Sequence, residues 1–436
     1  MSQNTNRKMK DSGIPWMPTI PDTWTVQRGK NILVLNKRPV RESDEVVTCF
    51  RDGEVILRSE RRTEGFTMSD KEIGYQGINK GDIVIHGMDG FAGSMGVSKS
   101  TGKGSPVLVV CSPKYDAVPQ FIIYYLRTLA MTDVFIALST GIRERSCDLR
   151  WNKIAELQFA LPSSNIQQRI ADFLDRKCAE IDELAALQET MIAELKRYKQ
   201  SVITEAVTKG LDPNVPMKDS GVEWIGEIPK GWEVIPFKQM YGLGKGLSIT
   251  KADLVEEGVP VISYGQIHSK SNTGTAIKDE LIRYVPTSYL ENNQDALVKV
   301  GDIIFADTSE DLEGCGNCIY IDKDMTLFAG YHTIIASNRT DTATRYLSYL
   351  FKTDCWRIQI RAVVNGVKLF SIPQRTLAAT SIITPPLAEQ RDIADYLDRK
   401  CTEIDELIAI KQQKIEALKE YKKSVIFEYV TGKKEL

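Results

Sequence analysis

Residues 170–178 read IADFLDRKC, and residues 393–401 read IADYLDRKC. The similarity continues beyond these residues at the same spacing of 223, and 25 of the 39 positions from Ile170 to Thr208 are identical in 393–431. Chance does not produce such agreement, so the chain contains an internal repeat. This repeated segment decides the fold, because both copies are long, highly charged and free of proline.

Each copy predicts one long helix, over 166–209 and 388–430. Apolar side chains recur at gaps of three, four and once seven residues, close to the period of a coiled coil. Acidic side chains come early and basic ones late, which complements the helix dipole. We expect the helices to pack antiparallel, with one domain at each end. The expected contact row is Leu174, Cys178, Ile181, Leu184, Met191, Leu195, Tyr198 and Val202, then Leu397, Cys401, Ile404, Ile408, Ile415, Leu418, Tyr421 and Val425.

A second block, MKDSG, recurs at 9–13 and 217–221, followed each time by Trp, Ile-Pro and Trp. The repeat unit is therefore an opening motif, a variable region and a long helix. Since the motif precedes the first variable region and the second helix ends like the first, we expect a closed pair of units with a pseudo-twofold axis. The variable regions, about 25–160 and 233–384, diverge in sequence and mix strand-like and helical runs, which predicts an α+β class. The predicted domains are 1–162, 163–210 (first helix), 211–385 and 386–436 (second helix).

Composition is that of a globular protein, with 436 residues, 42% hydrophobic and 26% charged side chains. No apolar run is long enough to span a bilayer, and the polar N-terminus does not resemble a secretory signal. The eight scattered cysteines are typical of free thiols in a reducing compartment, so we expect a cytoplasmic protein. A net charge of −2 argues against a general polyanion binder but permits local basic patches.

Basic side chains recur near the end of each variable region. Gly141-Ile-Arg143, followed by Ser146 and Arg150, resembles Gly366-Val-Lys368, followed by Ser371 and Arg375. Basic residues on a glycine turn can contact phosphates or base edges, although a solvated loop before the last strand would look the same. The DNA-binding candidates are Arg143, Arg145, Arg150, Lys368 and Arg375, with Lys99 and Lys103 from a glycine-rich turn.

Catalytic signatures are missing from the sequence. In the segment Gly96–Gly104, five residues rather than four separate Gly96 from Gly102, and Gly104 stands where a P-loop has the Ser or Thr that holds magnesium, so it is not a phosphate-binding P-loop. The Asn/Asp-Pro-Pro-aromatic signature of amino-methylating enzymes is absent. His86, His268 and His332 match no metal spacing, and Cys315 and Cys318 form a lone CxxC, which more often marks a turn than a zinc site. We therefore expect no catalysis, no metal and no cofactor in this chain.

Charged side chains also recur on the helix surfaces. A coiled-coil spacer has no reason to repeat its surface, so we interpret the recurrence as a site for a specific partner. These candidates are Asp172, Asp175, Arg176, Glu180 and Lys199, with their counterparts Asp395, Asp398, Arg399, Glu403 and Lys422.

The motifs together resemble those of the specificity (S) subunit of Type I restriction–modification systems. They are MKDSGVEWIGEIPKGW (217–232), PPLAEQRDIADYLD (385–398) and Ile-Asp-Glu-Leu followed by Tyr-Lys-x-Ser-Val-Ile, and they cover both repeats. One departure is that the first copy reads PSSNIQQ (162–168) where the double proline and glutamate usually stand.

The resemblance implies two target-recognition domains, each reading one half of a bipartite site in double-stranded DNA. It implies that the helices set the gap and bind two modification subunits, which hold S-adenosylmethionine and methylate adenine. Restriction subunits, where present, cleave DNA with ATP and Mg²⁺. Two other interpretations stay open from the residues alone: a coiled-coil adaptor joining two protein-binding domains, and a self-sufficient nuclease or methyltransferase. The target sequence, the gap and the stoichiometry do not follow from the sequence.

Overall fold

The computed structural model describes residues 7–61, 73–137, 149–340, 342–366 and 368–436. The chain forms two compact units, Met1–Glu189 with Gln412–Leu436, and Thr190–Lys411. Each unit holds one of the two divergent regions together with part of each long helix. In the described part of the chain, no helix has the length and apolar character needed to cross a membrane.

The two repeated segments form α5 (Ser164–Lys209) and α12 (Leu387–Val430), which confirms the predicted helices. Each is followed by a glycine with a left-handed backbone, Gly210 at φ 80° and Gly432 at φ 70°. Glycine adopts this conformation without strain and commonly follows a helix. The first glycine beyond each repeat therefore fixes where the helix ends.

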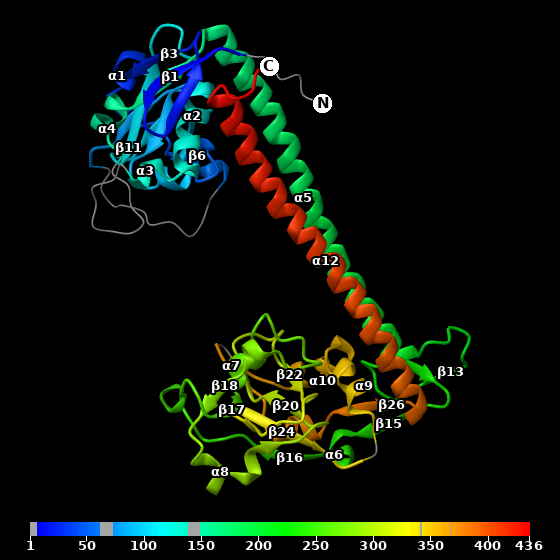
Figure 1. The fold of residues 1–436 in the computed structure, drawn as a ribbon. Coiled ribbons are helices and arrows are strands. Elements are labelled where there is room, and N and C mark those ends of the chain that lie inside the picture. Colours follow the sequence, from blue (N-terminus) through cyan, green and yellow to red (C-terminus); the bar gives the residue numbers. More distant parts are fainter. Residues whose placement is uncertain (1–6, 62–72, 138–148, 341, 367) are drawn as a thin grey trace. The chain divides into compact units, whose positions relative to one another are not determined.

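Within each unit the two helices pack side by side and run in opposite directions (Figure 1). In the first unit the Lys422 ammonium lies 2.6 Å from the Asp182 carboxylate. In the second unit Lys199 lies 2.6 Å from Asp405. Lys422 is the repeat counterpart of Lys199, and Asp405 that of Asp182. The two ion pairs are thus related as the predicted pseudo-twofold symmetry requires.

The shielded row of each helix advances strictly by four and then three residues. Because the sequence-based row chose the most apolar side chains, it was wrong at Leu184, Met191, Tyr198 and Tyr421, which are 45%, 39%, 52% and 50% exposed. The shielded positions lie one residue later and include lysines whose stems pack while their ammonium groups are paired. They are Leu174, Cys178, Ile181, Ala185, Gln188, Ile192, Leu195, Lys199 and Val202, with counterparts Leu397, Cys401, Ile404, Ile408, Lys411, Ile415, Leu418, Lys422 and Val425.

The first variable region is built on a four-stranded antiparallel sheet in the order β4-β11-β8-β9. Two-stranded pairings surround it: β1-β2, β3-β12, β5-β6 and β7-β10. The elements are β1 (Met9–Ile14), β2 (Met17–Pro21), β3 (Thr25–Arg28), α1 (Gly29–Ile32), β4 (Leu33–Leu35), β5 (Val47–Cys49), β6 (Val55–Leu57), β7 (Gln76–Ile78), β8 (Ile83–His86), β9 (Met95–Val97), β10 (Gly102–Gly104), β11 (Leu108–Pro113), α2 (Pro119–Met131), α3 (Val134–Ala137), α4 (Trp151–Glu156) and β12 (Gln158–Leu161).

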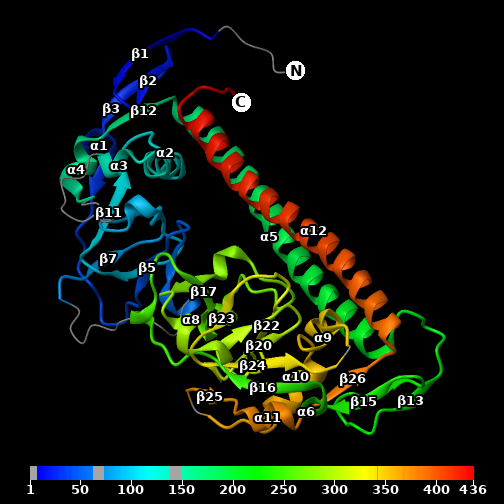
Figure 2. The same ribbon diagram turned by 60° about the horizontal axis from the view of Figure 1, so that its bottom comes forward.

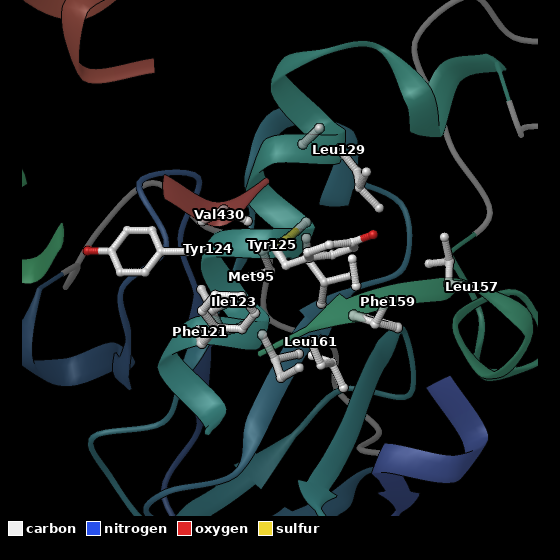
Figure 3. Close-up of a cluster of buried hydrophobic side chains, with 14 of the residues drawn as sticks. Met95, Phe121, Ile123, Tyr124, Tyr125, Leu129, Leu157, Phe159, Leu161 and Val430 are labelled. Carbon is white, nitrogen blue, oxygen red and sulfur yellow. The ribbon is translucent and has the colours of Figure 1, made fainter. Parts of the chain in front are cut away.

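The core of this unit lies where α2 meets the sheet. Figure 3 shows Phe121 and Tyr125 of α2 gathered with Met95 of β9 and Phe159 of β12, and all four side chains are buried. Val430, the last residue of α12, lies in the same cluster. The C-terminal end of α12 therefore packs in the hydrophobic core of the first domain.

The second variable region, whose elements are labelled in Figure 2, repeats this frame in its strand order despite its different sequence. Its main sheet has the order β16-β24-β20-β22, and β13-β14 and β15-β26 match β1-β2 and β3-β12. A further sheet, β18-β17-β23-β19, has no four-stranded counterpart in the described part of the first domain. The elements are β13 (Met217–Asp219), β14 (Glu227–Pro229), β15 (Glu233–Pro236), α6 (Phe237–Met240), β16 (Tyr241–Lys245), β17 (Val259–Ile262), α7 (Tyr264–Ile267), β18 (Arg283–Val285), α8 (Tyr289–Asn292), β19 (Leu297–Val298), β20 (Ile303–Ala306), β21 (Thr308–Ser309), β22 (Cys318–Tyr320), β23 (Leu327–Ala329), β24 (Thr333–Asn338), α9 (Thr344–Leu350), α10 (Asp354–Arg361), β25 (Phe370–Ser371), α11 (Gln374–Ala378) and β26 (Ser381–Thr384).

One tryptophan in each unit receives the end of a long helix. A side chain on Gly432 would come within 3.1 Å of the Trp24 ring, and one on Gly210 within 3.2 Å of the Trp232 ring. Both tryptophans are almost fully buried. The opening motif is therefore the seat of a helix end, and α12 returns to the first domain as α5 reaches the second.

Candidate nucleic-acid interface

The loops that follow β8 and β20 occupy the same place in the two frames. In the first domain the Gly87 N–H donates to the Val107 carbonyl, and in the second the Asp307 N–H donates to the His332 carbonyl. A later segment then crosses each loop: the Leu149 N–H donates to Gly87, and the Ile372 N–H donates to Asp307. The two domains thus present one equivalent loop with different side chains.

In the second domain this loop carries a polar pair. The Nδ1 atom of His332 lies 3.2 Å from Oδ1 of Asp307, which also accepts the Thr308 hydroxyl at 2.7 Å. His332 has a left-handed backbone at φ 54°, and its side chain is 58% exposed. Left-handed non-glycine residues are uncommon and mark special positions. His332 is therefore held outward by its turn and anchored at one ring nitrogen.

Aromatic side chains surround this pair. The Tyr264 ring lies 5.4 Å from the His332 ring and 6.2 Å from the His268 ring, edge to face in both cases. His268 is bonded on both sides, by Nε2 to the Thr308 carbonyl at 2.8 Å and by Nδ1 to the Asn317 amide at 3.1 Å. His268 therefore serves as a fixed support, whereas His332 is accessible.

A cleft of about 810 Å³ adjoins the same loop through Tyr264, His268 and Ser309. Lys352 and Arg357 also line it, and Arg357 donates from Nε to the Phe351 carbonyl at 2.8 Å. Burial lowers the pKa of Lys352 from 10.5 to about 8. The cleft therefore combines cationic side chains with the carboxylates of Glu310, Asp311, Glu313 and Asp354 beside the β20 loop.

The equivalent loop of the first domain has other chemistry. Met88 is 54% exposed, and the Asp89 carboxylate pairs with Arg51 at 3.3 Å. His86 accepts the Asp89 N–H at its Nδ1 atom, and burial lowers the pKa of His86. This loop thus presents the exposed Met88 and a carboxylate, Asp89, that is paired with a guanidinium from the turn between β5 and β6.

The basic residues singled out in the sequence fall in different places. Arg143 and Arg145 lie outside the described residues. Arg150 is exposed and immediately precedes α4, the position that Pro373 holds before α11. The predicted alignment of Arg150 with Arg375 is therefore wrong by two residues, because the Leu149 and Ile372 bonds fix the register. Arg375 lies inside α11 and is exposed.

The other basic candidates lie on the surface of their domains. Lys368 is exposed two residues before β25, which pairs with β21 directly after the β20 loop. Lys99 is exposed and pairs with Glu54 at 2.8 Å. Lys103 lies in β10, and its N–H donates to the Glu45 carbonyl. The glycine-rich segment between them is a turn from β9 to β10 and precedes no helix.

Several helix candidates make bonds within the chain. Asp175 accepts from the Tyr124 hydroxyl at 2.7 Å, and its counterpart Asp398 accepts from Tyr349 and from both nitrogens of an Arg345 fork. Lys199 and Lys422 form the ion pairs between the helices. Glu180 and Glu403 pair with lysines on their own helix. Asp172, Arg176, Asp395 and Arg399 are exposed. No observation tests these ten residues as a partner surface, so that role stays a prediction.

Sequence reasoning missed a repeated set of exposed apolar side chains on the helices. Leu187 and its counterpart Ile410 are 52% and 56% exposed, and Leu184 and its counterpart Leu407 are 45% and 46% exposed. Tyr198 and Tyr421 complete the set at 52% and 50%. The signal was present, because all three pairs recur at the spacing of 223. Leu184, Tyr198 and Tyr421 were assigned to the contact row, and Leu187, Leu407 and Ile410 were not considered.

Among the described residues, no cluster of three or more His, Cys, Asp or Glu side chains could hold a metal ion. The seven described cysteines are free thiols. Cys315 and Cys318 are both buried, and the Cys315 thiol donates to the Asp311 carbonyl at 3.6 Å. In the described part of the chain, the CxxC segment therefore matches the turn interpretation.

Comparisons with known proteins agree with this architecture. The family model described as the Type I restriction modification DNA specificity domain matches residues 229–420. The Type I restriction enzyme MjaVIII specificity subunit of Methanocaldococcus jannaschii is 25% identical over 425 residues, covering 95% of this chain and 93% of the relative. The putative MjaX specificity subunit of the same organism is 24% identical, covering 84% and 76%.

Solved structures share the fold. A chain from a type I R-M system superposes with a TM-score of 0.70 at 14% identity, covering 94% of this chain and 98% of the other. The HsdS subunit from Thermoanaerobacter tengcongensis gives a TM-score of 0.54 at 15% identity, covering 95% and 98%.

Proposed function

Because this chain belongs to the family of Type I restriction–modification specificity subunits, we propose that each of its two domains reads one half of a bipartite DNA site. The observation that supports this most is the repeated frame. Both domains use the same sheet order but carry different side chains at the loops after β8 and β20. Two copies of one scaffold with different contact residues suit two unrelated short sequences, since base contacts specify sequence and the scaffold only positions them.

The chain is a non-catalytic subunit that recognises DNA. Under the proposal, methyl transfer to adenine belongs to two modification subunits that hold S-adenosylmethionine. Restriction subunits, where the system has them, cleave with ATP and Mg²⁺. The chain's contribution is then to place the other subunits over the correct sequence.

The helix pair is the proposed docking site for the modification subunits. Exposed apolar side chains of this size are unusual on an isolated coiled coil, where the outer positions are polar. Leu187 and Ile410 recur by repeat, which gives two equivalent patches and accounts for two subunits. The flanking charges of Asp172 and Arg176, and of their counterparts, would then orient each subunit.

DNA contacts by basic side chains are part of the same proposal. Lys368 lies beside the β20 loop through the β21-β25 pairing, so it is placed to meet a phosphate if that loop faces a groove. Arg150 lies beside the β8 loop through Leu149. Arg143, Arg145, Arg375, Lys99 and Lys103 are further candidates for phosphate contacts.

The exchange of one domain tests the proposal. Residues 25–160 are replaced by the same region of a relative, and methylated adenines are mapped across the host genome. One half-site should change while the other half-site and the gap persist. A methylome in which both half-sites change would rule out independent readers.

The adaptor alternative predicts a different result. A complex purified with this chain should bind a duplex with an affinity that falls steeply with salt, because neutralising phosphates releases counterions. An adaptor of two protein-binding domains would bind duplex weakly whatever the salt concentration.

A further inference from the structure

We infer that Asp307 and His332 determine the identity of one base in the half-site read by the second domain, and that this base carries an exocyclic amino group. The inference rests on the proposed function, since it assumes that the second domain enters a groove of DNA. It goes further by naming the atoms that read and the chemistry that they accept.

The pair is not needed to build the frame. Gly87 and Val107 hold the equivalent positions in the first domain and make the same backbone hydrogen bond. The Asp307 N–H donates to His332 at 3.1 Å, and the Gly87 N–H donates to Val107 at 2.9 Å. The scaffold therefore folds with a glycine and a valine at these two places. Folding alone therefore does not explain why the second domain has a carboxylate and an imidazole at these positions.

The pair is fixed on its inner side and open on its outer side. Oδ1 of Asp307 is occupied by Thr308 and His332, and Nδ1 of His332 is occupied by Asp307. Within the described ranges, neither Oδ2 of Asp307 nor Nε2 of His332 has a hydrogen-bond partner. Tyr264 packs edge to face on the imidazole and limits its rotation. Two polar atoms are thus held outward by a small network, which lowers the entropy lost when they bind.

The protonation pattern decides what these atoms can read. A carboxylate accepts only, so the Nδ1 atom of His332 must carry the proton that it shares with Asp307. In the neutral ring, Nε2 is then an acceptor as well. Outward acceptors complement a base edge that donates, and a base-paired amino group offers them one free N–H. In the major groove the donors are the N4 amino group of cytosine and the N6 amino group of adenine, and Asp is suited to the former.

The first domain supports the inference by contrast. Its loop presents the exposed Met88, which matches a thymine methyl group, and its carboxylate Asp89 is paired with Arg51 from the turn between β5 and β6. The equivalent loops thus differ in what surrounds their carboxylates, a guanidinium at Asp89 and an imidazole at Asp307. This is what two different half-sites require.

The test uses Asp307→Asn and His332→Asn in the full chain, produced in its host with its natural partner subunits. Asparagine preserves the size of the aspartate side chain and tolerates the left-handed backbone of His332. Glu291→Gln in α8 is the matched control, because it removes one exposed carboxylate elsewhere in the same domain. Exchange of residues 233–384 first identifies which half-site the second domain reads.

We expect both asparagine variants to relax one position of that half-site, with a loss of discrimination of about 5- to 150-fold, the range of a good base-edge contact. The other half-site and the control should be unchanged. Unaltered discrimination in both variants would overturn the inference, and so would loss of methylation at every site, which indicates a structural role. If the exchange itself leaves both half-sites intact, the proposed function fails instead, so the two failures are distinguishable.

Discussion

Trp24 and Trp232 occupy equivalent positions against the end of a long helix, yet only the Trp232 indole N–H has a hydrogen-bond partner among the described residues. The Trp232 indole N–H donates to Oε2 of Glu389 at 2.9 Å. The repeat counterpart of Glu389 is Ile166, and among the described residues the buried Trp24 N–H has no partner. The departure of the first copy from the second at the start of the helix, PSSNIQQ against PPLAEQR, therefore has a physical cost at one indole. A buried unsatisfied donor costs about 1–3 kcal/mol.

Exchanging Glu389 and Ile166 should exchange which of the two indole N–H groups has a hydrogen-bond acceptor. Glu389→Ile should lower the free energy of unfolding of the second unit by about 1–3 kcal/mol, because it leaves the Trp232 N–H unsatisfied. Ile166→Glu should raise the stability of the first unit by supplying the missing acceptor, less the apolar contact that Ile166 gives up. Hydrogen exchange, resolved by unit, measures both. Equal protection of the second unit with and without Glu389 would show that the bond is not stabilising.

Lys352 gives the second unit a pH dependence. Burial depresses its pKa to about 8, against 10.5 in the unfolded chain, so the unfolded state binds more protons between these values. Stability should therefore rise as pH increases from about 8 toward 10.5. Since the side chain reaches the cleft, we expect a gain of only about 1–2 kcal/mol. Lys352→Met should remove this gain and raise stability at pH 7. Thermal unfolding of the unmodified chain and of Lys352→Met at pH 7 and pH 10 measures this difference. Equal changes in stability between the two pH values in both proteins would contradict the prediction.

At the scale of single elements, the long helices could be predicted almost to the residue. Absence of proline and the first glycine after each repeat set their ends, and both signals are local. The shielded row was misplaced because hydrophobicity alone was used to find it. Ala185, Lys199 and Lys422 are shielded, whereas Leu184 and Tyr198 are exposed. A strict four–three step would have found the row, since steric packing follows spacing before polarity.

The exposed apolar residues should matter for assembly rather than for folding. Leu187→Glu together with Ile410→Glu should leave helix content and DNA-independent stability unchanged, because both side chains face solvent in this chain. Recovery of modification subunits with the purified chain should fall at least tenfold. Glu194→Lys, also exposed on α5, is the control and should have no such effect. Full recovery with both glutamates in place would move the docking site away from these helix faces.

At the scale of the whole molecule, the shared frame of the two domains was hidden from the sequence. Strand positions accept any apolar side chain of suitable size, so Ile83-Val84-Ile85 and Ile303-Ile304-Phe305 serve the same role without revealing it. The mistaken alignment of Arg150 with Arg375 has the same cause. Only the hydrogen bonds of Leu149 and Ile372 fix which residues correspond, and bonds between distant segments leave no local pattern.

The lengths of α5 and α12 predict the gap between half-sites. One added heptad in each helix, after Gln188 and after Lys411, preserves the four–three row and lengthens each helix by about 10 Å. With base pairs stacked about 3.4 Å apart, the gap should grow by about three base pairs while both half-sites stay the same. Methylome mapping of the double insertion measures this. A gap that does not change would assign the spacing to the linkers around 210–217 and 385–388.

The seat used twice, by Trp24 for the end of α12 and by Trp232 for the end of α5, has a genetic consequence. Each domain is bounded on both sides by segments that the other domain also possesses. Homologous recombination within those segments exchanges a whole reader without disturbing any joint, because every crossover product still ends its helices on the same two tryptophans. A population of such genes can therefore recombine existing readers into new pairs, and every offspring allele inherits a chain that already fits together.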